Sequence, residues 1–222
     1  MIIAIIQARL NSKRFPNKVL KKINKNNDIL DILIKKLTTS KFIDKIYIAT
    51  GSKKINFKIK DKEKYNNVKV IFGSNTNVAS RFIKILKISN AKYFIRITAD
   101  NPFTDMILME KLIRKIKKRK LNYLYYDEKT IPLGTGTEVL LSQYFINHYK
   151  FFSTMGKEHV TFDLKKLKGS IKIKQKSKFF PLSLTVDTIN DFNLIRYLYC
   201  MFGECNYIDL NKKIQKYINA NS

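Results

Sequence analysis

Hydrophobic and polar positions alternate along the first half of the chain in blocks that predict strands and helices in turn. Ile2 to Ile6 is a continuous apolar run, which is typical of a strand buried on both faces. Asp28 to Leu37 instead has apolar residues at a helical spacing, and Asp28 can cap the helix. The same patterns predict strands at 45–50, 68–72 and 93–98, a helix that starts at Asn77, and a helix that Thr104 caps and that runs to about Arg119.

The second half of the chain is less regular. Its patterns predict short strands at 123–126, 138–141, 171–174 and 182–186, and a helix at 189–201. Strands joined by helices need parallel crossovers, so we expect an α/β fold with a mostly parallel sheet flanked by helices. No repeat or linker divides the 222 residues, which suits one domain. Residues 142–174 are expected to form a small subdomain or a dimerisation arm, which leaves a homodimer open.

A polar and basic loop follows the first predicted strand. Within it lie four cations in ten residues, Arg9, Lys13, Arg14 and Lys18. At the carboxyl end of a parallel strand, backbone N–H groups and cationic side chains build phosphate sites. The loop therefore favours a triphosphate site, and the alternative is an ordinary solvated turn in a lysine-rich chain.

Two aspartates also follow predicted strands. Asp100 comes just after the strand at 93–98, and Asp187 ends the strand at 182–186. Magnesium usually takes one or two carboxylates together with substrate phosphates. Either aspartate alone is equally typical of a turn or a helix cap. Their pairing with the basic loop favours a magnesium–triphosphate site.

Three further side chains are weaker candidates. Arg81 lies one turn into a predicted helix after Gly73 and Ser74, and it either points toward the nucleotide or is a surface cation. Glu158 and His159 are candidate substrate contacts, although a lone histidine is more often structural.

Composition adds little to this functional prediction. The net charge of +27 would attract any polyanion, but lysine is spread over the whole chain, so we expect no specific nucleic-acid binding. Cys200 and Cys205 form no CxxC motif and have no histidine nearby in sequence, which disfavours zinc and suits a reduced, cytoplasmic protein. The N-terminal apolar run is too short for a membrane span and lacks the pattern of a secretory signal.

These motifs resemble a known family. Residues 5–20, IIQARLNSKRFPNKVL, resemble the opening IIQARMGSTRLPGKVL of cytidylyltransferases of the spore-coat polysaccharide type, relatives of CMP-KDO and CMP-sialate synthetases. Residues 96–102, RITADNP, are similar to the family's RITGDCP. The resemblance continues, in order, through 40–50, 72–82, 158–161 and 184–188, and so covers nearly the whole chain.

The resemblance implies a Rossmann-like nucleotidyltransferase sheet and the transfer of CMP from CTP to an acidic or phosphorylated sugar, with release of pyrophosphate, for surface glycan biosynthesis. The alternatives are a non-catalytic polyanion- or nucleotide-binding protein of the same fold, or a transferase that uses another nucleoside triphosphate. The implied site comprises Lys18, Arg14 and Asp100 in catalysis; Gln7, Ala8, Arg9, Ser12, Arg14, Lys18, Gly73, Ser74 and Arg81 on the nucleotide; Glu138, Glu158 and His159 on the substrate; and Asp100 and Asp187 on Mg²⁺.

The chain departs from the family pattern in two loops. Asn11 and Asn17 replace glycines, so we expect a shifted backbone, although asparagine tolerates positive φ. Residues 134–138 read GTGTE where relatives often have GLDVE, so a carboxylate is missing. The acceptor sugar is therefore expected to differ from that of the nearest relatives.

Overall fold

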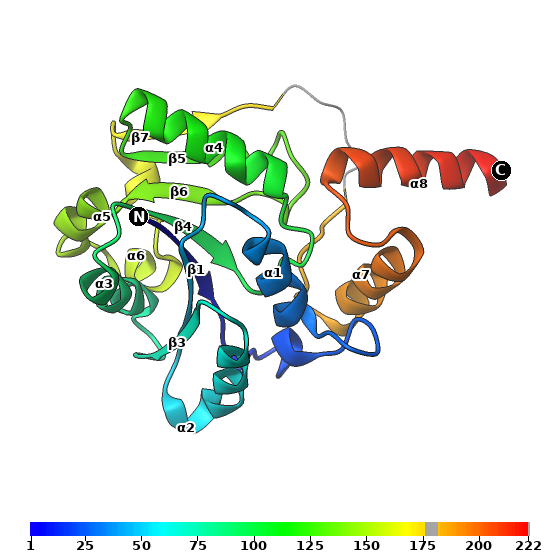
Figure 1. Ribbon diagram of the computed structural model, residues 1–222, viewed down its shortest axis with the longest axis horizontal. Helices are drawn as coiled ribbons and strands as arrows, with labels where there is room; N and C mark the ends of the chain where they lie inside the picture. The colour runs from blue at the N-terminus through cyan, green and yellow to red at the C-terminus, as the bar shows by residue number, and fades with distance from the viewer. Residues whose placement is uncertain (176–181, 222) are drawn as a thin grey trace.

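A single sheet of seven strands organises the part of the chain that the computed structural model describes, residues 1–175 and 182–221. The strands lie in the order β3-β2-β1-β4-β6-β5-β7 (Figure 1). Only β6 is antiparallel to its neighbours, so the expected mostly parallel sheet is confirmed. The strands are β1 (Ile2–Gln7), β2 (Lys45–Thr50), β3 (Val68–Phe72), β4 (Tyr93–Thr98), β5 (Tyr123–Tyr126), β6 (Glu138–Leu141) and β7 (Ser170–Ile173).

Helices cover both faces of this sheet. Successive side chains of a strand point to opposite faces, so Ala4 and Ile6 join one core with α1 and α4, while Ile3 and Ile5 join another with α3 and α5. No helix in the described ranges is long and apolar enough to cross a membrane. The helices are α1 (Ile29–Thr38), α2 (Lys53–Asn56), α3 (Val78–Ser89), α4 (Met106–Arg119), α5 (Ser142–Tyr149), α6 (Thr154–His159), α7 (Ile189–Phe202) and α8 (Tyr207–Asn221), with 3₁₀ turns η1 (Lys18–Leu20), η2 (Phe57–Lys64) and η3 (Leu164–Lys166).

Side-chain caps define where the helices begin. Asp28 accepts the Asp31 N–H in a capping box at the start of α1, which confirms the predicted cap. Asn77 caps α3, which begins at the next residue, Val78, close to the predicted start at Asn77. The prediction that Thr104 caps α4 is wrong. Asp105 accepts the Leu108 N–H instead.

One predicted strand is absent. Residues 182–186 have no strand partner within 1–175 and 182–221, and their backbone N–H groups make isolated hydrogen bonds from Leu184 to the Leu133 carbonyl and from Val186 to the Asp100 carbonyl. Leu184 and Val186 are buried in a third core beside Phe15 and Phe192. The alternation of apolar residues in this segment therefore indicates that their side chains are buried, and it does not indicate a strand of the sheet.

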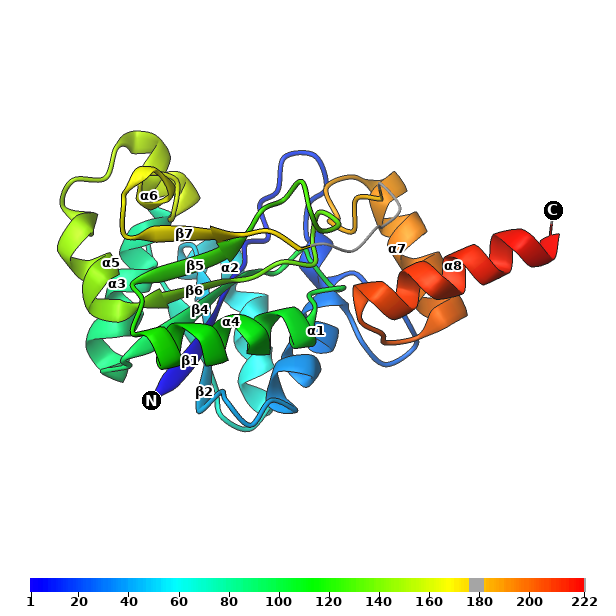
Figure 2. The ribbon, with the colours of Figure 1, turned by 90° about the horizontal axis from the view of Figure 1, so that it is seen from above.

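The topology opens a crevice at the carboxyl end of β1. The chain proceeds from β1 to β2 and β3 on one side and then returns to place β4 on the other side. Ligands of open α/β sheets bind where the strand order reverses in this way. Residues 142–173 extend the same body, because α5 and α6 pack against α3 and β7 pairs with β5. Helix α8 extends away from the sheet (Figure 2).

Candidate active site

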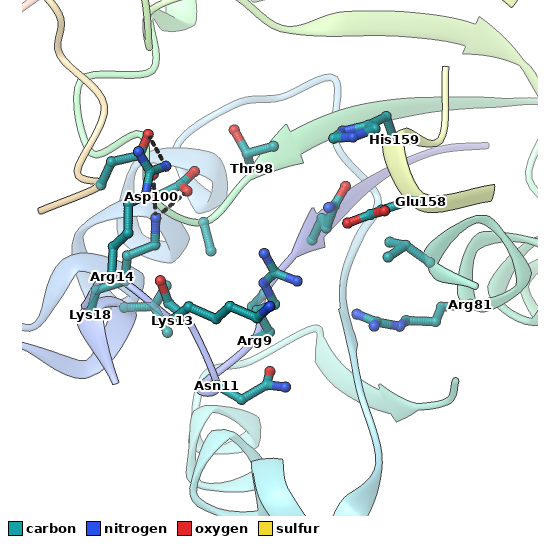
Figure 3. A pocket seen from close by; sticks show the side chains of 17 residues that line it. Arg9, Asn11, Lys13, Arg14, Lys18, Arg81, Thr98, Asp100, Glu158 and His159 are labelled. Carbon is teal, nitrogen blue, oxygen red and sulfur yellow. Dashed lines mark hydrogen bonds and ion pairs between the residues drawn. The ribbon is translucent and has the colours of Figure 1, made fainter. Parts of the chain in front are cut away.

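Two adjoining cavities open at the crevice. The first, of about 510 Å³, contains the basic loop after β1 (Figure 3). The second, of about 360 Å³, lies toward β5 and β6. Thr98, Asp100 and Asp187 border both cavities, so a group held in one can reach a group held in the other.

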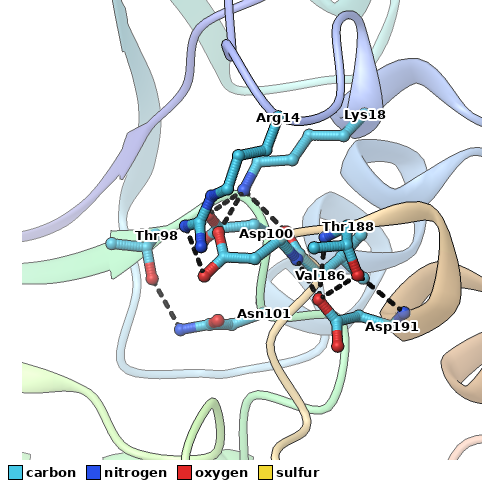
Figure 4. A network of polar contacts seen from close by, with 9 residues as sticks. Arg14, Lys18, Thr98, Asp100, Asn101, Val186, Thr188 and Asp191 are labelled. Carbon is cyan, nitrogen blue, oxygen red and sulfur yellow. Dashed lines mark hydrogen bonds and ion pairs between the residues drawn. The ribbon is translucent and has the colours of Figure 1, made fainter.

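An ion-paired cluster marks this shared border (Figure 4). The Lys18 ammonium donates to Asp100 Oδ2 at 2.7 Å, to Asp187 Oδ1 at 3.0 Å and to the Val186 carbonyl at 2.6 Å. Arg14 Nη2 lies 2.9 Å from Asp187 Oδ2. Segments far apart in the sequence therefore place two cations and two carboxylates around one point.

The backbone before Lys18 explains how the loop reaches that point. Asn17 adopts the left-handed conformation with φ of 58°, at a position where the family motif has glycine. Asparagine is among the few residues that adopt this conformation readily, so the turn into η1 is kept. Lys18 itself is buried, with 6% of its surface exposed.

The side chains of Asp100 and Asp187 do not serve as the helix cap or the turn contact that the sequence also allowed. Thr188 caps α7 in a capping box with Asp191, as the sequence allowed. At the end of β4, the Asn101 amide and Thr98 hydroxyl form the side-chain contact of the turn. The carboxylates of Asp100 and Asp187 are instead directed to Lys18 and Arg14.

These carboxylates form a donor set that suits magnesium. One oxygen of Asp100 and one of Asp187 lie within 3.0 Å of the same Lys18 nitrogen, so both can face a single cation. The described residues hold no cluster of three or more acidic, histidine or cysteine side chains. The remaining ligands would have to be phosphate or water oxygens, which is the usual arrangement for magnesium.

Arg81 forms part of the wall of the first cavity. Its guanidinium donates to the Ser74 carbonyl at 2.7 Å and to the Asn75 carbonyl at 3.2 Å. Burial and the nearby charge of Arg9 lower the pKa of Arg81 to about 10, so it remains a cation at neutral pH. A Cβ on Gly73 would lie 2.9 Å from Arg81 Cγ. Gly73 and Ser74 therefore support Arg81 and do not themselves line the cavity.

A tight turn connects the two cavities. Glu158 and His159, at the end of α6, line the first cavity across from Arg9 (Figure 3). Val160 follows with φ of 59° and ψ of −55°, and the Thr161 N–H donates to the His159 carbonyl at 2.6 Å. This is a classic γ-turn, which is rare and strained for a β-branched residue. The Thr161 hydroxyl then donates to Glu138 Oε2 at 2.8 Å in the second cavity.

Glu138 lines the second cavity and is ion-paired on two sides. It lies opposite Arg96 in the β4–β6 pairing, and its carboxylate lies 3.1 Å from both Arg96 Nη1 and Lys165 Nζ. Burial alone would raise the pKa of Glu138, but the charges of Arg96 and Lys165 lower it below its ordinary value. Burial alone would lower the pKa of Lys165, but the negative charges of Glu138 and Glu128 raise it above its ordinary value.

The structure gathers most of the predicted site residues at the crevice. Gly73 and Ser74 line neither cavity, and Glu138 lines the second. The sequence prediction missed Arg96 and Lys165, although a charged residue inside the apolar strand at 93–98 was a usable signal. The predicted residues that line the first cavity are Gln7, Ala8, Arg9, Ser12, Arg14, Lys18, Arg81, Asp100, Glu158, His159 and Asp187.

Comparison with known proteins identifies relatives of the whole chain. The cytidylyltransferase family matches residues 3–201. An uncharacterized protein of Methanocaldococcus jannaschii, MJ1063, is 34% identical over 234 residues, with 99% of this chain and 95% of the relative covered. The spore coat polysaccharide biosynthesis protein SpsF of Bacillus subtilis is 29% identical over 214 residues, with 91% and 88% covered.

A solved structure shows the same fold. A cytidylyltransferase from Leptospira borgpetersenii superposes with a TM-score of 0.90 at 22% identity, over 98% of this chain and 95% of that one. The resemblance seen in the sequence motifs is thereby confirmed. The chain belongs to the cytidylyltransferase family and is a CTP-dependent nucleotidyltransferase.

Proposed function

We propose that this enzyme transfers CMP from CTP to an acidic or phosphorylated sugar and releases pyrophosphate, with Mg²⁺ as its cofactor. The observation that carries the proposal is the common border of the two cavities at Asp100 and Asp187. The first cavity holds the nucleotide against the basic loop. The second cavity presents the acceptor to the α-phosphate at that border.

The cations of the first cavity hold and neutralise the triphosphate. Arg9, Lys13, Arg14 and Lys18 all line it, and Arg81 adds a buried positive charge to the wall. As pyrophosphate leaves, Lys18 and Arg14 stabilise the negative charge on its oxygens. Preorganised charge of this kind is usually the largest single contribution to such catalysis.

Asp100 and Asp187 would hold the magnesium ion. When bound, the ion supplies charge neutralisation and polarisation of phosphoryl oxygens. Lys18 and Arg14 occupy the same carboxylates in the structure, so binding of the metal and the triphosphate would transfer these cations to phosphate oxygens. An acceptor oxygen that is already anionic needs no strong general base.

The biological setting is part of the same proposal. The match to a spore coat polysaccharide biosynthesis protein supports a role in the synthesis of a surface glycan. We propose a cytoplasmic location, in keeping with the two free cysteines, Cys200 and Cys205.

A pyrophosphate-release screen tests the reaction. Four nucleoside triphosphates are each combined with magnesium and a panel of acidic sugars and sugar phosphates. We expect turnover with CTP and an acceptor. Preference for another triphosphate would refute CTP as the donor, and tight CTP binding without turnover on any acceptor would favour the non-catalytic alternative.

We predict that Asp100→Asn and Asp187→Asn each abolish magnesium-dependent transfer and leave the fold intact. An amide keeps the size of the side chain but is a poor ligand for a hard cation. Because the two aspartates act as a unit, the double variant should be little worse than either single one. Initial rates against magnesium concentration measure this, with thermal unfolding as a check on the fold.

Asp61→Asn provides a matched control, since Asp61 is exposed on η2. It should keep the wild-type rate. A near-normal rate at low magnesium in either site variant would remove that aspartate from the proposed metal site.

A further inference from the structure

The second cavity has an acidic lining in a strongly basic protein. The chain carries 44 Lys and Arg against 17 Asp and Glu. Among the described residues that line the first cavity, five cations face three carboxylates. Among those that line the second cavity, two cations face four carboxylates, namely Arg96 and Lys165 against Asp100, Glu128, Glu138 and Asp187.

Both cations of the second cavity already have carboxylate partners. Arg96 pairs with Glu138 at 3.1 Å, and Arg96 Nη2 also donates to the Gln7 amide oxygen at 3.3 Å. Lys165 lies between Glu138 at 3.1 Å and Glu128 at 3.3 Å. The carboxylate of an acceptor would therefore have to compete with Glu138 and Glu128 for these two cations. It would also be repelled by the negative charges of both glutamates, which disfavours binding of a sugar acid in this cavity.

Three polar atoms of residues that line this cavity, one on the Arg96 cation and two on neutral side chains, have no hydrogen-bond partner among the described residues. These buried atoms are Arg96 Nε, Asn101 Oδ1 and Thr137 Oγ1. Arg96, Asn101 and Thr137 all line the second cavity. Sugar hydroxyls can both donate and accept hydrogen bonds, so they suit this mixture of one donor, one acceptor and one hydroxyl.

Among the described residues, the cations that could neutralise an anionic acceptor lie only at the border that the second cavity shares with the first. Lys18 and Arg14 are the cations in contact with the border residues Asp100 and Asp187. A phosphate placed at that border would be neutralised there. A carboxylate placed deeper in the second cavity would not be neutralised, because the cations there are already paired with glutamates.

We propose that the acceptor is a neutral sugar or polyol whose only anionic group is the attacking phosphate. This inference rests on the proposed function and selects the phosphorylated class over the sugar acids. The acceptor phosphate lies at the shared border, and the hydroxylated carbon chain or ring occupies the second cavity.

The reaction then balances without a proton transfer. A phosphate oxygen of the acceptor forms a bond to the α-phosphorus of CTP. The bond from the α-phosphorus to the oxygen that bridges to the β-phosphorus breaks, and its electron pair leaves with pyrophosphate. The product is a cytidine diphosphate ester of the sugar or polyol.

Matched acceptor pairs test the proposal. Aldose phosphates, pentitol phosphates and glycerol phosphate form one set, and N-acetylneuraminic acid and an octulosonic acid form the other. We expect the best phosphate acceptor to exceed the best sugar acid by about 100-fold or more in kcat/KM for pyrophosphate release, as a like-charge mismatch implies. Equal or better use of a sugar acid overturns the proposal, and so does absence of turnover with every sugar phosphate.

Charge variants of the cavity provide the second arm. Glu128→Gln and Glu138→Gln each remove one competing carboxylate, so each should narrow the preference for phosphate acceptors over sugar acids, by about tenfold if one like-charge contact is relieved. Glu128 has a side chain that is 67% exposed, so its variant tests the idea even if the buried Glu138 variant folds poorly. Glu204→Gln makes the same change at an exposed position on the α7–α8 loop and should leave the preference unchanged. An unchanged preference in Glu128→Gln counts against the proposal.

Calorimetric titration with CTP and magnesium distinguishes a failure of the proposed CTP-dependent reaction from a failure of the proposed acceptor class. Failure of CTP to bind would refute the proposed function itself. Binding of CTP with preferential turnover of sugar acids would refute the acceptor class alone.

Discussion

At the scale of single residues, Lys18 is the side chain on which the site depends most. Its ammonium neutralises both Asp100 and Asp187 in the ligand-free structure and is placed to stabilise pyrophosphate during the reaction. Because these aspartates are 24% and 40% exposed, water can partly solvate them when the lysine is removed. The energetic cost of losing Lys18 should therefore be small in the free enzyme and large in the transition state.

We predict that Lys18→Ala lowers kcat/KM for CTP by about 100- to 1000-fold, the equivalent of roughly 3–4 kcal/mol of transition-state stabilisation. The unfolding midpoint should fall little, and magnesium should raise it more than in the wild type, because Asp100 loses its Lys18 partner and Asp187 keeps only the ion pair with Arg14. Steady-state kinetics and thermal unfolding with and without magnesium measure both effects. Lys25→Ala, a change at an exposed lysine of the next loop, should show neither. Wild-type turnover in Lys18→Ala would exclude Lys18 from the site.

Single residues also show how far the sequence could predict the site. The phosphate-loop cations are predictable from the sequence because four of them lie within ten residues and follow a buried strand. Arg96 and Lys165 were missed because their roles depend on the pairing of β4 with β6 and on the fold of the segment after α6. Gly73 was assigned to the nucleotide, but its absent side chain makes room for Arg81, a contact that no local pattern reveals.

At the scale of elements, strands that pair in the sheet were predicted well. Mostly apolar segments bounded by turns predict the limits of β2 to β6 correctly, because most of their side chains are buried or half-buried. Residues 182–186 have a similar pattern for a different reason, since Leu184 and Val186 pack against α7 without a strand partner. Burial is thus readable from one sequence, whereas hydrogen-bond partners depend on the tertiary fold.

The pairing of β6 with β4 leads to a prediction of pH dependence. The pKa of Glu138 is lowered in the folded protein, so its ion pairs contribute stability above the ordinary value of 4.5 and lose it as pH falls through the lower folded pKa. The free energy of unfolding of the wild type should therefore decrease below about pH 4.5 more steeply than that of Glu138→Gln. At neutral pH the variant should be less stable by about 2–3 kcal/mol, which is less than for a fully buried pair because Lys165 is 31% exposed.

Urea unfolding between about pH 7 and pH 3.5 provides the measurement. Glu204→Gln, which removes an exposed carboxylate, is the matched control and should follow the wild-type curve. Parallel curves for wild type and Glu138→Gln would contradict the lowered pKa.

At the scale of the whole molecule, the charge of +27 has to be reconciled with a site that discriminates between anions. The first cavity concentrates cations in a concave space, whereas the second carries an acidic lining within the same surface. A general positive field draws polyanions toward the protein but does not distinguish them, and it is screened over about 8 Å at physiological salt. Selectivity must therefore come from the short-range contacts within the cavities.

We predict that DNA and RNA bind this protein weakly and without sequence preference. Their affinity should come from counterion release, with a dissociation constant of about 1–100 μM at physiological salt and a steep loss as salt rises. CTP binding should depend less on salt, because its contacts are fewer and lie in a partly buried cavity. Fluorescence anisotropy with random and defined oligonucleotides, and titration with CTP over the same salt series, compare the two. If one nucleic-acid sequence binds tightly at physiological salt, the positive charge encodes a recognition function that the active site does not explain.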